Sequence, residues 1–229
     1  MFFGDPTFLL VIPALILAFY AQARVKGAYR KYSQVLASSR VTGAQAAHQL
    51  LQTAGAGEVT IEKAAGELTD HYDPRKKVLR LSQGVHDSTS IAALGIAAHE
   101  TGHAIQHHTR YQPMALRSVI YPVASLGSTL AFPLFFIGFI MSSKGPSPLM
   151  DIGILLFAGA VAFSVVTLPV EFNASKRAMA LLEERRFLTG DELAGAKKVL
   201  GAAALTYVAS TAVAATQLLR MVLLRSSRD

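Results

Sequence analysis

The sequence predicts a mainly α-helical membrane protein with three or four hydrophobic helices and a small cytoplasmic α+β domain. The first observation is composition: 52% of the 229 residues are hydrophobic and only 16% are charged, whereas about 25% of the residues in soluble domains are charged. The second is that four stretches without any charged residue approach the roughly 20 residues that a helix needs to cross a bilayer. Together they exclude a disordered chain, a fibrous repeat and an ordinary soluble enzyme.

The charge-free stretches cover residues 6–23, 118–143, 152–170 and 199–219. The first is followed, not preceded, by basic residues, so we expect a retained anchor rather than a cleaved signal peptide. Two interpretations of the fourth stay open, a membrane span and a buried or interfacial helix. A span would place Arg220, Arg225 and Arg228 outside the cell, which favours the buried or interfacial helix.

The placement of basic residues predicts an orientation in the plasma membrane. Basic residues gather at 24–40 and 176–186, whereas the link at 142–150 contains only Lys144. The positive-inside rule therefore places residues 24–117 and the chain from Glu171 onward in the cytoplasm. We interpret the net charge of +7 as flanks that face anionic lipid, and we expect no nucleic-acid partner.

This orientation divides the chain into four parts of one integrated unit. They are an anchor at 1–23, a cytoplasmic region at 24–117, a transmembrane hairpin at 118–170 and a C-terminal helical region at 171–229.

Local patterns predict the elements of the cytoplasmic region. Thr42 and Gln45 have the spacing of a capping box, which predicts a helix ending near Gly55. Residues 59–62 form a candidate strand. Further extended segments at 68–72 and 78–82 flank a turn-rich loop and predict a β-hairpin, and a helix is expected over about 90–110. The chain has no cysteine, which excludes disulfides, thiolate zinc sites and a cysteine nucleophile.

The predicted helix over 90–110 contains the pattern H-E-x-x-H. His99 and His103 are four residues apart, so both imidazoles lie on one face and can bind a single zinc ion. Glu100, beside them, is then placed to act as a general base. The apolar run at 91–98 would bury the other side of the helix. The alternative is a pair of structural histidines.

The third zinc ligand must come from elsewhere, because catalytic zinc normally has three protein ligands and a water. The metzincin pattern requires histidine at the position of Thr109 and therefore fails. His107 is a weaker alternative, since three successive helical turns do not converge easily on one ion. Glu171 would complete a His₂Glu site, with Ser175 one turn further as an outer partner and Asn173 as its competitor.

A hydrolase also needs a donor to the developing oxyanion, and it needs a way to hold its substrate. Tyr207 is a candidate donor because its hydroxyl lies in an apolar helix and needs a partner. His71, Tyr72, Arg177 and Tyr111 stay open as alternatives. An exposed edge strand near the zinc would pair with an extended polypeptide by β-augmentation. The other expected partner is the lipid bilayer.

Four segments together resemble a known family: residues 73–82, 97–104, 169–175 and 204–209. Over most of its length the chain is similar to the YugP-type neutral zinc metallopeptidases, and more distantly to the gluzincins, including the HtpX and prenyl-protease group. The resemblance implies one Zn²⁺ per chain on His99, His103 and Glu171, with Glu100 as base. Ser175 is a departure, because the wider gluzincin signature has aspartate there.

These observations predict a membrane-embedded zinc endopeptidase. It would hydrolyse peptide bonds in membrane or membrane-proximal proteins through a zinc-bound water activated by Glu100. The alternative is a metal-binding membrane sensor or adaptor without proteolytic activity, although such a protein needs no base. A transporter or channel is disfavoured because the four apolar stretches contain no ionisable group. Mn²⁺ and Co²⁺ also accept imidazole and carboxylate ligands.

Overall fold

The computed structural model describes residues 6–141, 145 and 147–227, and the chain is mainly helical. Its segments cluster into two compact units, each built from distant parts of the sequence. We call the first the helical unit; it comprises Met1–Ala21, Ala115–Leu168 and Thr206–Asp229. We call the second the mixed unit; it comprises Gln22–Met114 and Pro169–Leu205.

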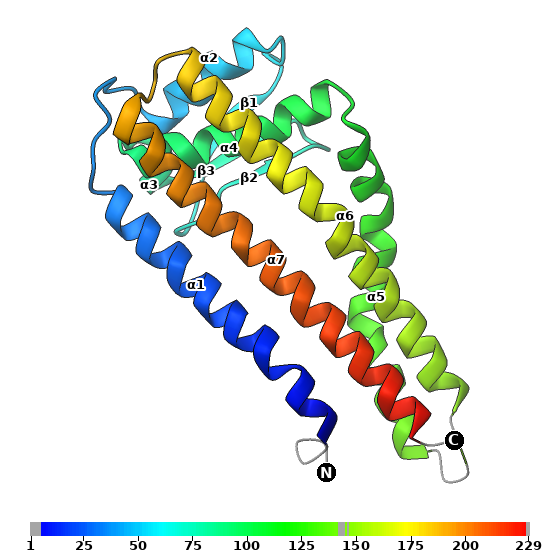
Figure 1. Ribbon diagram of the computed structural model, residues 1–229. Coiled ribbons are helices and arrows are strands. Elements are labelled where there is room, and N and C mark those ends of the chain that lie inside the picture. Colours follow the sequence, from blue (N-terminus) through cyan, green and yellow to red (C-terminus); the bar gives the residue numbers. More distant parts are fainter. Residues whose placement is uncertain (1–5, 142–144, 146, 228–229) are drawn as a thin grey trace. The chain divides into compact units, whose positions relative to one another are not determined.

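Four long helices contribute to both units (Figure 1). They are α1 (Ile12–Tyr32), α5 (Gln112–Met141), α6 (Pro148–Glu184) and α7 (Gly190–Ser226). The remaining elements are the short 3₁₀ helix η1 (Pro6–Leu10) in the helical unit and, in the mixed unit, α2 (Gly43–Thr53), β1 (Thr60–Ala64), β2 (His71–Asp73), β3 (Val78–Ser82), α3 (Gln83–His86) and α4 (Ile91–His108).

Four helical segments are long and apolar enough to cross a membrane: Pro6–Tyr32, α5, α6 and α7. The predicted hydrophobic helices are therefore present. The fourth predicted stretch, 199–219, lies inside α7, which is one of these four candidate spans by length and composition. The end of the second stretch, Lys144 and Arg228 lie outside the described residues.

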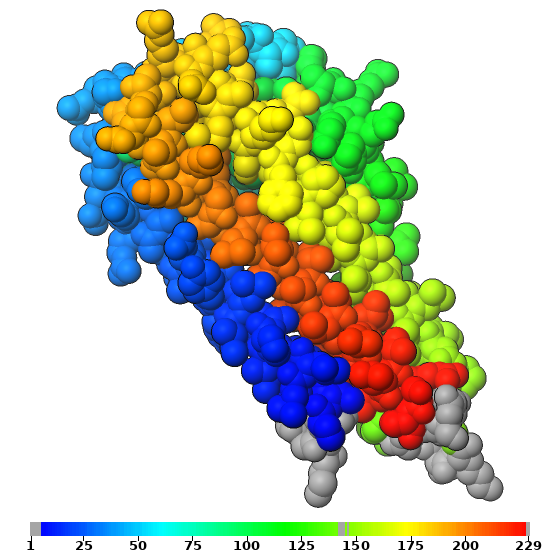
Figure 2. Space-filling view, in the orientation of Figure 1, coloured from blue at the N-terminus to red at the C-terminus, as the bar shows by residue number. Residues whose placement is uncertain are grey.

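The helical unit is held together by aromatic packing and by close helix contacts. Its buried cluster includes Phe135 and Phe157. A Cβ atom on Gly153 of α6 would lie 2.7 Å from the carbonyl oxygen of Ala131 in α5, so these two backbones approach as closely as glycine permits. Within this unit the N-terminal segment, α7 and α6 lie side by side on the face shown in Figure 2.

The sheet of the mixed unit has the strand order β1-β3-β2. β2 and β3 pair antiparallel, which confirms the predicted hairpin, whereas β1 pairs parallel to β3 with Ile61 opposite Leu79. β2 begins later than the predicted residue 68. Leu68 adopts a positive φ of 55° in a bend, so the chain is not extended there. The Asp70 carboxylate accepts the backbone N–H of Ser82 at 2.8 Å.

Helix α4 is buried on two sides, which explains its apolar sequence. Ser90 caps its first turn by accepting the N–H of Ala93, and the helix ends close to the predicted residue. One side packs against the sheet and α2, and the other packs against α6 and α7. The capping box predicted for α2 is also present, with both reciprocal bonds between Thr42 and Gln45.

Candidate metal centre

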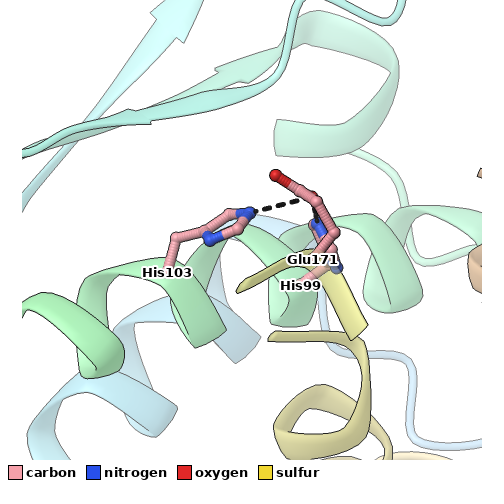
Figure 3. Close-up of side chains that lie close together, drawn as sticks. All are labelled: His99, His103 and Glu171. Carbon is pink, nitrogen blue, oxygen red and sulfur yellow. Dashed lines mark ion pairs between the residues drawn. The ribbon is translucent and has the colours of Figure 1, made fainter. Parts of the chain in front are cut away.

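His99 and His103 of α4 and Glu171 of α6 converge in the mixed unit, as Figure 3 shows. The Oε2 atom of Glu171 lies 3.3 Å from Nε2 of His99 and 3.4 Å from Nε2 of His103. The three ligand atoms lie within 4.8 Å of one another. Glu171 is 1% exposed and His103 is 7% exposed, whereas His99 is partly exposed, so two of the three side chains are buried.

The two distances from Glu171 to the histidines fit a zinc ion better than a simple ion pair. Ligand atoms about 2.0–2.1 Å from a tetrahedral zinc lie about 3.3 Å from one another. Charge-assisted hydrogen bonds between imidazolium and carboxylate are shorter, about 2.7–2.9 Å. Two imidazole nitrogens and one carboxylate oxygen also form a ligand set that zinc accepts. The residues present therefore fit zinc in type, and the two distances from Glu171 fit it in spacing.

A close approach between α4 and α6 brings the three candidate ligands together. A Cβ atom on Gly102 would lie 2.7 Å from the carbonyl oxygen of Ala174, a distance that no real Cβ tolerates. Glycine at position 102 therefore lets the two backbones nearly touch. Further along α6, Ala178 and Leu182 are buried on the same face of the helix as Ala174 and Glu171. This apolar face thus holds Glu171 beside the histidines.

Ser175 lies next to the first histidine, one turn after Glu171. Its Oγ atom is 3.1 Å from Nδ1 of His99. A hydroxyl in this place can accept the Nδ1 proton of His99 and leave Nε2 with its lone pair toward Glu171. The group that contacts Nδ1 of His99 is therefore a neutral hydroxyl.

Sequence reasoning missed Gln106, which contacts the second histidine. This fully buried residue places Oε1 3.0 Å from Nδ1 of His103, and its Nε2 donates to the backbone carbonyl of Val170 at 2.8 Å. The sequence offered little signal, because Gln106 lies among other polar residues in the second half of the helix and directly precedes His107 and His108. Asn173, expected as an alternative outer partner, accepts from Nε2 of Gln106 at 3.0 Å and so connects to the histidine through it.

Burial shifts the pKa of the candidate base. Glu100 is partly buried, and this raises the pKa of its carboxyl, although the neighbouring His103 and His99 act in the opposite direction. Burial by itself would lower the pKa of His103, but the contact with Glu171 and the charge of Glu100 outweigh it, and the pKa is raised. A raised carboxyl pKa suits a group that must both accept and release a proton.

The other candidates have different neighbours. Nδ1 of His107 lies 2.9 Å from the hydroxyl of Tyr72, and Nδ1 of His108 lies 3.5 Å from Glu58, so neither belongs to the metal-ligand group. The guanidinium of Arg177 lies over the ring of Tyr111 at 6.0 Å. Tyr207 belongs to the part of α7 in the helical unit, and its role as a donor stays a prediction.

Comparisons with known proteins agree with this chemistry. The family model described as "Putative neutral zinc metallopeptidase" matches residues 7–226. A curated relative, "Putative membrane protease YugP" of Bacillus subtilis (strain 168), is 46% identical over 215 residues, which cover 94% of each chain. No solved structure matches the chain.

Proposed function

The chain belongs to the family of neutral zinc metallopeptidases, and we propose that it is a membrane-embedded zinc endopeptidase with His99, His103 and Glu171 as zinc ligands. The observation that carries the proposal is the convergence of two Nε2 atoms on Oε2 of Glu171 at 3.3 and 3.4 Å. Three protein ligands leave the fourth tetrahedral position for water or substrate, as catalytic zinc requires.

The chemistry divides between the metal and Glu100. When bound, zinc acts as a Lewis acid that polarises the scissile carbonyl and lowers the pKa of water. Glu100 accepts a proton from the attacking water as the water oxygen bonds to the carbonyl carbon. The same carboxyl then gives this proton to the amide nitrogen as the C–N bond breaks. Tyr207 remains the proposed donor to the oxyanion, with Tyr72 and Arg177 among the alternatives.

The proposed substrate is an extended polypeptide that pairs with β2. Within the described chain β2 hydrogen-bonds to β3 alone, so it is an edge strand, and it packs beside α4, which carries both histidines. An edge strand supplies main-chain donors and acceptors to a substrate whatever its sequence. The candidate membrane spans favour membrane or membrane-proximal substrates, and the basic flanks favour a cytoplasmic site.

The experiment compares wild type, Glu100→Gln and the exposed-acid control Glu184→Gln in detergent. Zinc content is measured by mass spectrometry, and cleavage is measured on an unfolded protein. We expect about one zinc per chain in all three proteins and a loss of cleavage of about 10²–10⁴-fold in Glu100→Gln only. Wild-type cleavage by Glu100→Gln would contradict the role of Glu100. Zinc bound without any hydrolysis by wild type would favour the sensor or adaptor.

A further inference from the structure

We propose that Gln106 is a positioning residue that sets which nitrogen of His103 faces the metal and ties this histidine to the backbone beside Glu171. The inference rests on the proposed zinc site and concerns a residue that never touches the ion. Gln106 is fully buried, so its amide must satisfy its hydrogen bonds within the protein.

The hydrogen-bond partners determine how the Gln106 amide is oriented. The carbonyl oxygen of Val170 can only accept, so the group 2.8 Å from it must be the NH₂ of Gln106. The contact with Asn173 independently supports the same orientation of the Gln106 amide. Arg177 can only donate, and its Nε lies 2.8 Å from Oδ1 of Asn173, so this oxygen accepts from Arg177 and from Gln106 alike. Oε1 of Gln106 must therefore face His103.

This orientation assigns the proton on His103. Oε1 is an acceptor, so Nδ1 of His103, 3.0 Å away, must carry the hydrogen. Neutral His103 then has its lone pair on Nε2, the atom that faces Glu171 at 3.4 Å. The opposite tautomer would place two acceptors against each other in a buried place. Through this hydrogen bond, Gln106 leaves the Nε2 lone pair of His103 available to coordinate a metal ion before the ion binds.

The same amide also links the two helices that carry ligands. It contacts His103 on α4 and the carbonyl of Val170 on α6, and Val170 directly precedes Glu171. Ser175, in contrast, contacts only one ligand, His99, in its bond at 3.1 Å. We therefore expect Gln106 to contribute more to zinc affinity than Ser175, because it positions a ligand on each helix.

The test measures the zinc dissociation constant of full-length protein in detergent by competition with a chelator. Gln106→Met keeps the length of the side chain and removes all three of its hydrogen bonds, to His103, Val170 and Asn173; we expect about 10–100-fold weaker binding. The matched control is Thr101→Val, which removes a buried hydroxyl on the same helix that bonds only to the carbonyl of Ala97, and it should bind like wild type.

A second measurement does not depend on whether the variants fold. The imidazole ¹⁵N spectrum of zinc-loaded wild type should show His103 with a protonated Nδ1 and a metal-bound Nε2. The inference is overturned if the proton is on Nε2, or if Gln106→Met binds zinc as tightly as Thr101→Val. Wild type that binds no zinc would overturn the proposed function itself. Wild type that binds zinc with an unaffected Gln106→Met would overturn the positioning role alone.

Discussion

The mixed unit and the helical unit differ in what they bury and what they expose. Most of the buried polar side chains that the structure describes belong to the mixed unit: Ser82, Ser90, Thr101, His103, Gln106 and Glu171. The exposed large hydrophobic side chains show the reverse. Among the described residues, only Val35, Leu36, Leu68 and Phe172 of this class lie in the mixed unit, and the rest lie in the helical unit.

This contrast matches the different surroundings that we expect for the two units, lipid around the helical unit and water around the mixed unit. An apolar exterior suits lipid, where helices satisfy their own backbone groups and side chains need no hydrogen bonds. A buried polar group in the mixed unit is tolerated because it has partners, as Gln106 has in His103 and Val170. Polar chemistry is therefore concentrated where protein, not lipid, surrounds it. Substitutions in the two units should consequently fail in different ways.

The largest effect is expected from Glu171→Ala, which removes the one proposed ligand on α6. Zinc content should fall well below one per chain and cleavage should reach background, because two imidazoles alone leave the ion poorly held. Glu183→Ala, an exposed acid further along α6, is the control and should keep its zinc. Metal analysis by mass spectrometry decides the question. Equal zinc in the two variants would exclude Glu171 and reopen His107 as a ligand.

A smaller effect is expected where α4 meets α6. Gly102→Ala places a methyl group 2.7 Å from the carbonyl oxygen of Ala174, so the helices must separate at a cost of about 1–3 kcal/mol. Because Glu171 lies beside this contact, zinc affinity should fall as well. Gly95→Ala on the same helix meets Ala196 at an ordinary 3.5 Å and should be neutral or stabilising by up to about 1 kcal/mol. Thermal unfolding and chelator competition measure both effects, and equal behaviour of the two variants would contradict the close approach.

The helical unit offers the matching pair on α6. Gly153→Ala would bring a methyl group 2.7 Å from the carbonyl oxygen of Ala131, whereas a Cβ on Gly159 has no neighbour within 4 Å. We expect Gly153→Ala to lower the melting temperature in detergent and Gly159→Ala to leave it nearly unchanged. Zinc affinity should be unaffected in both, in contrast to Gly102→Ala. A loss of zinc affinity in Gly153→Ala would contradict the expectation that substitutions in the two units fail in different ways.

Features that depend on local periodicity could be predicted from the sequence. The helix that carries His99 and His103, the capping box at Thr42 and the hairpin all follow from spacings within a few residues. Glu171 could be named as a ligand because the topology and the family resemblance placed a helical acid on the same side of the membrane. Its distances of 3.3 and 3.4 Å to the histidines were not predictable, since they depend on how closely α4 and α6 pack at Gly102.

Features that depend on tertiary contacts could not be predicted in the same way. The parallel pairing of β1 with β3 joins strands that carry no signal of their relative direction. β2 starts late because Asp70 turns to the N–H of Ser82, a side-chain contact that competes with strand geometry. Gln106 is one of several polar residues in the second half of its helix, so the sequence did not single it out. Its contacts with Val170 and Asn173 join segments far apart in the sequence and are seen only in the structure.

The smallest effect concerns Tyr72 in the mixed unit, whose hydroxyl lies 2.9 Å from Nδ1 of His107. Burial, followed by the nearby charges of Glu58 and Asp73, raises the pKa of Tyr72 from 10.0 to about 12. Between these values the folded protein keeps the phenolic proton and the unfolded chain loses it, so the stability from this group is complete below pH 10 and declines as pH rises toward 12. Solvent reaches part of the ring, so the decline should be slight.

The absorbance of phenolate near 295 nm, taken as wild type minus Tyr72→Phe, should therefore rise with a midpoint near pH 12. Denaturant unfolding at pH 9 and pH 11 checks the linked stability: wild type should lose more free energy of unfolding between these pH values than Tyr72→Phe does. The comparison with Tyr72→Phe cancels the titration of the other tyrosines. A midpoint near pH 10 would show that β2 leaves the ring in water, and it would weaken the case for β2 as an ordered strand edge beside α4.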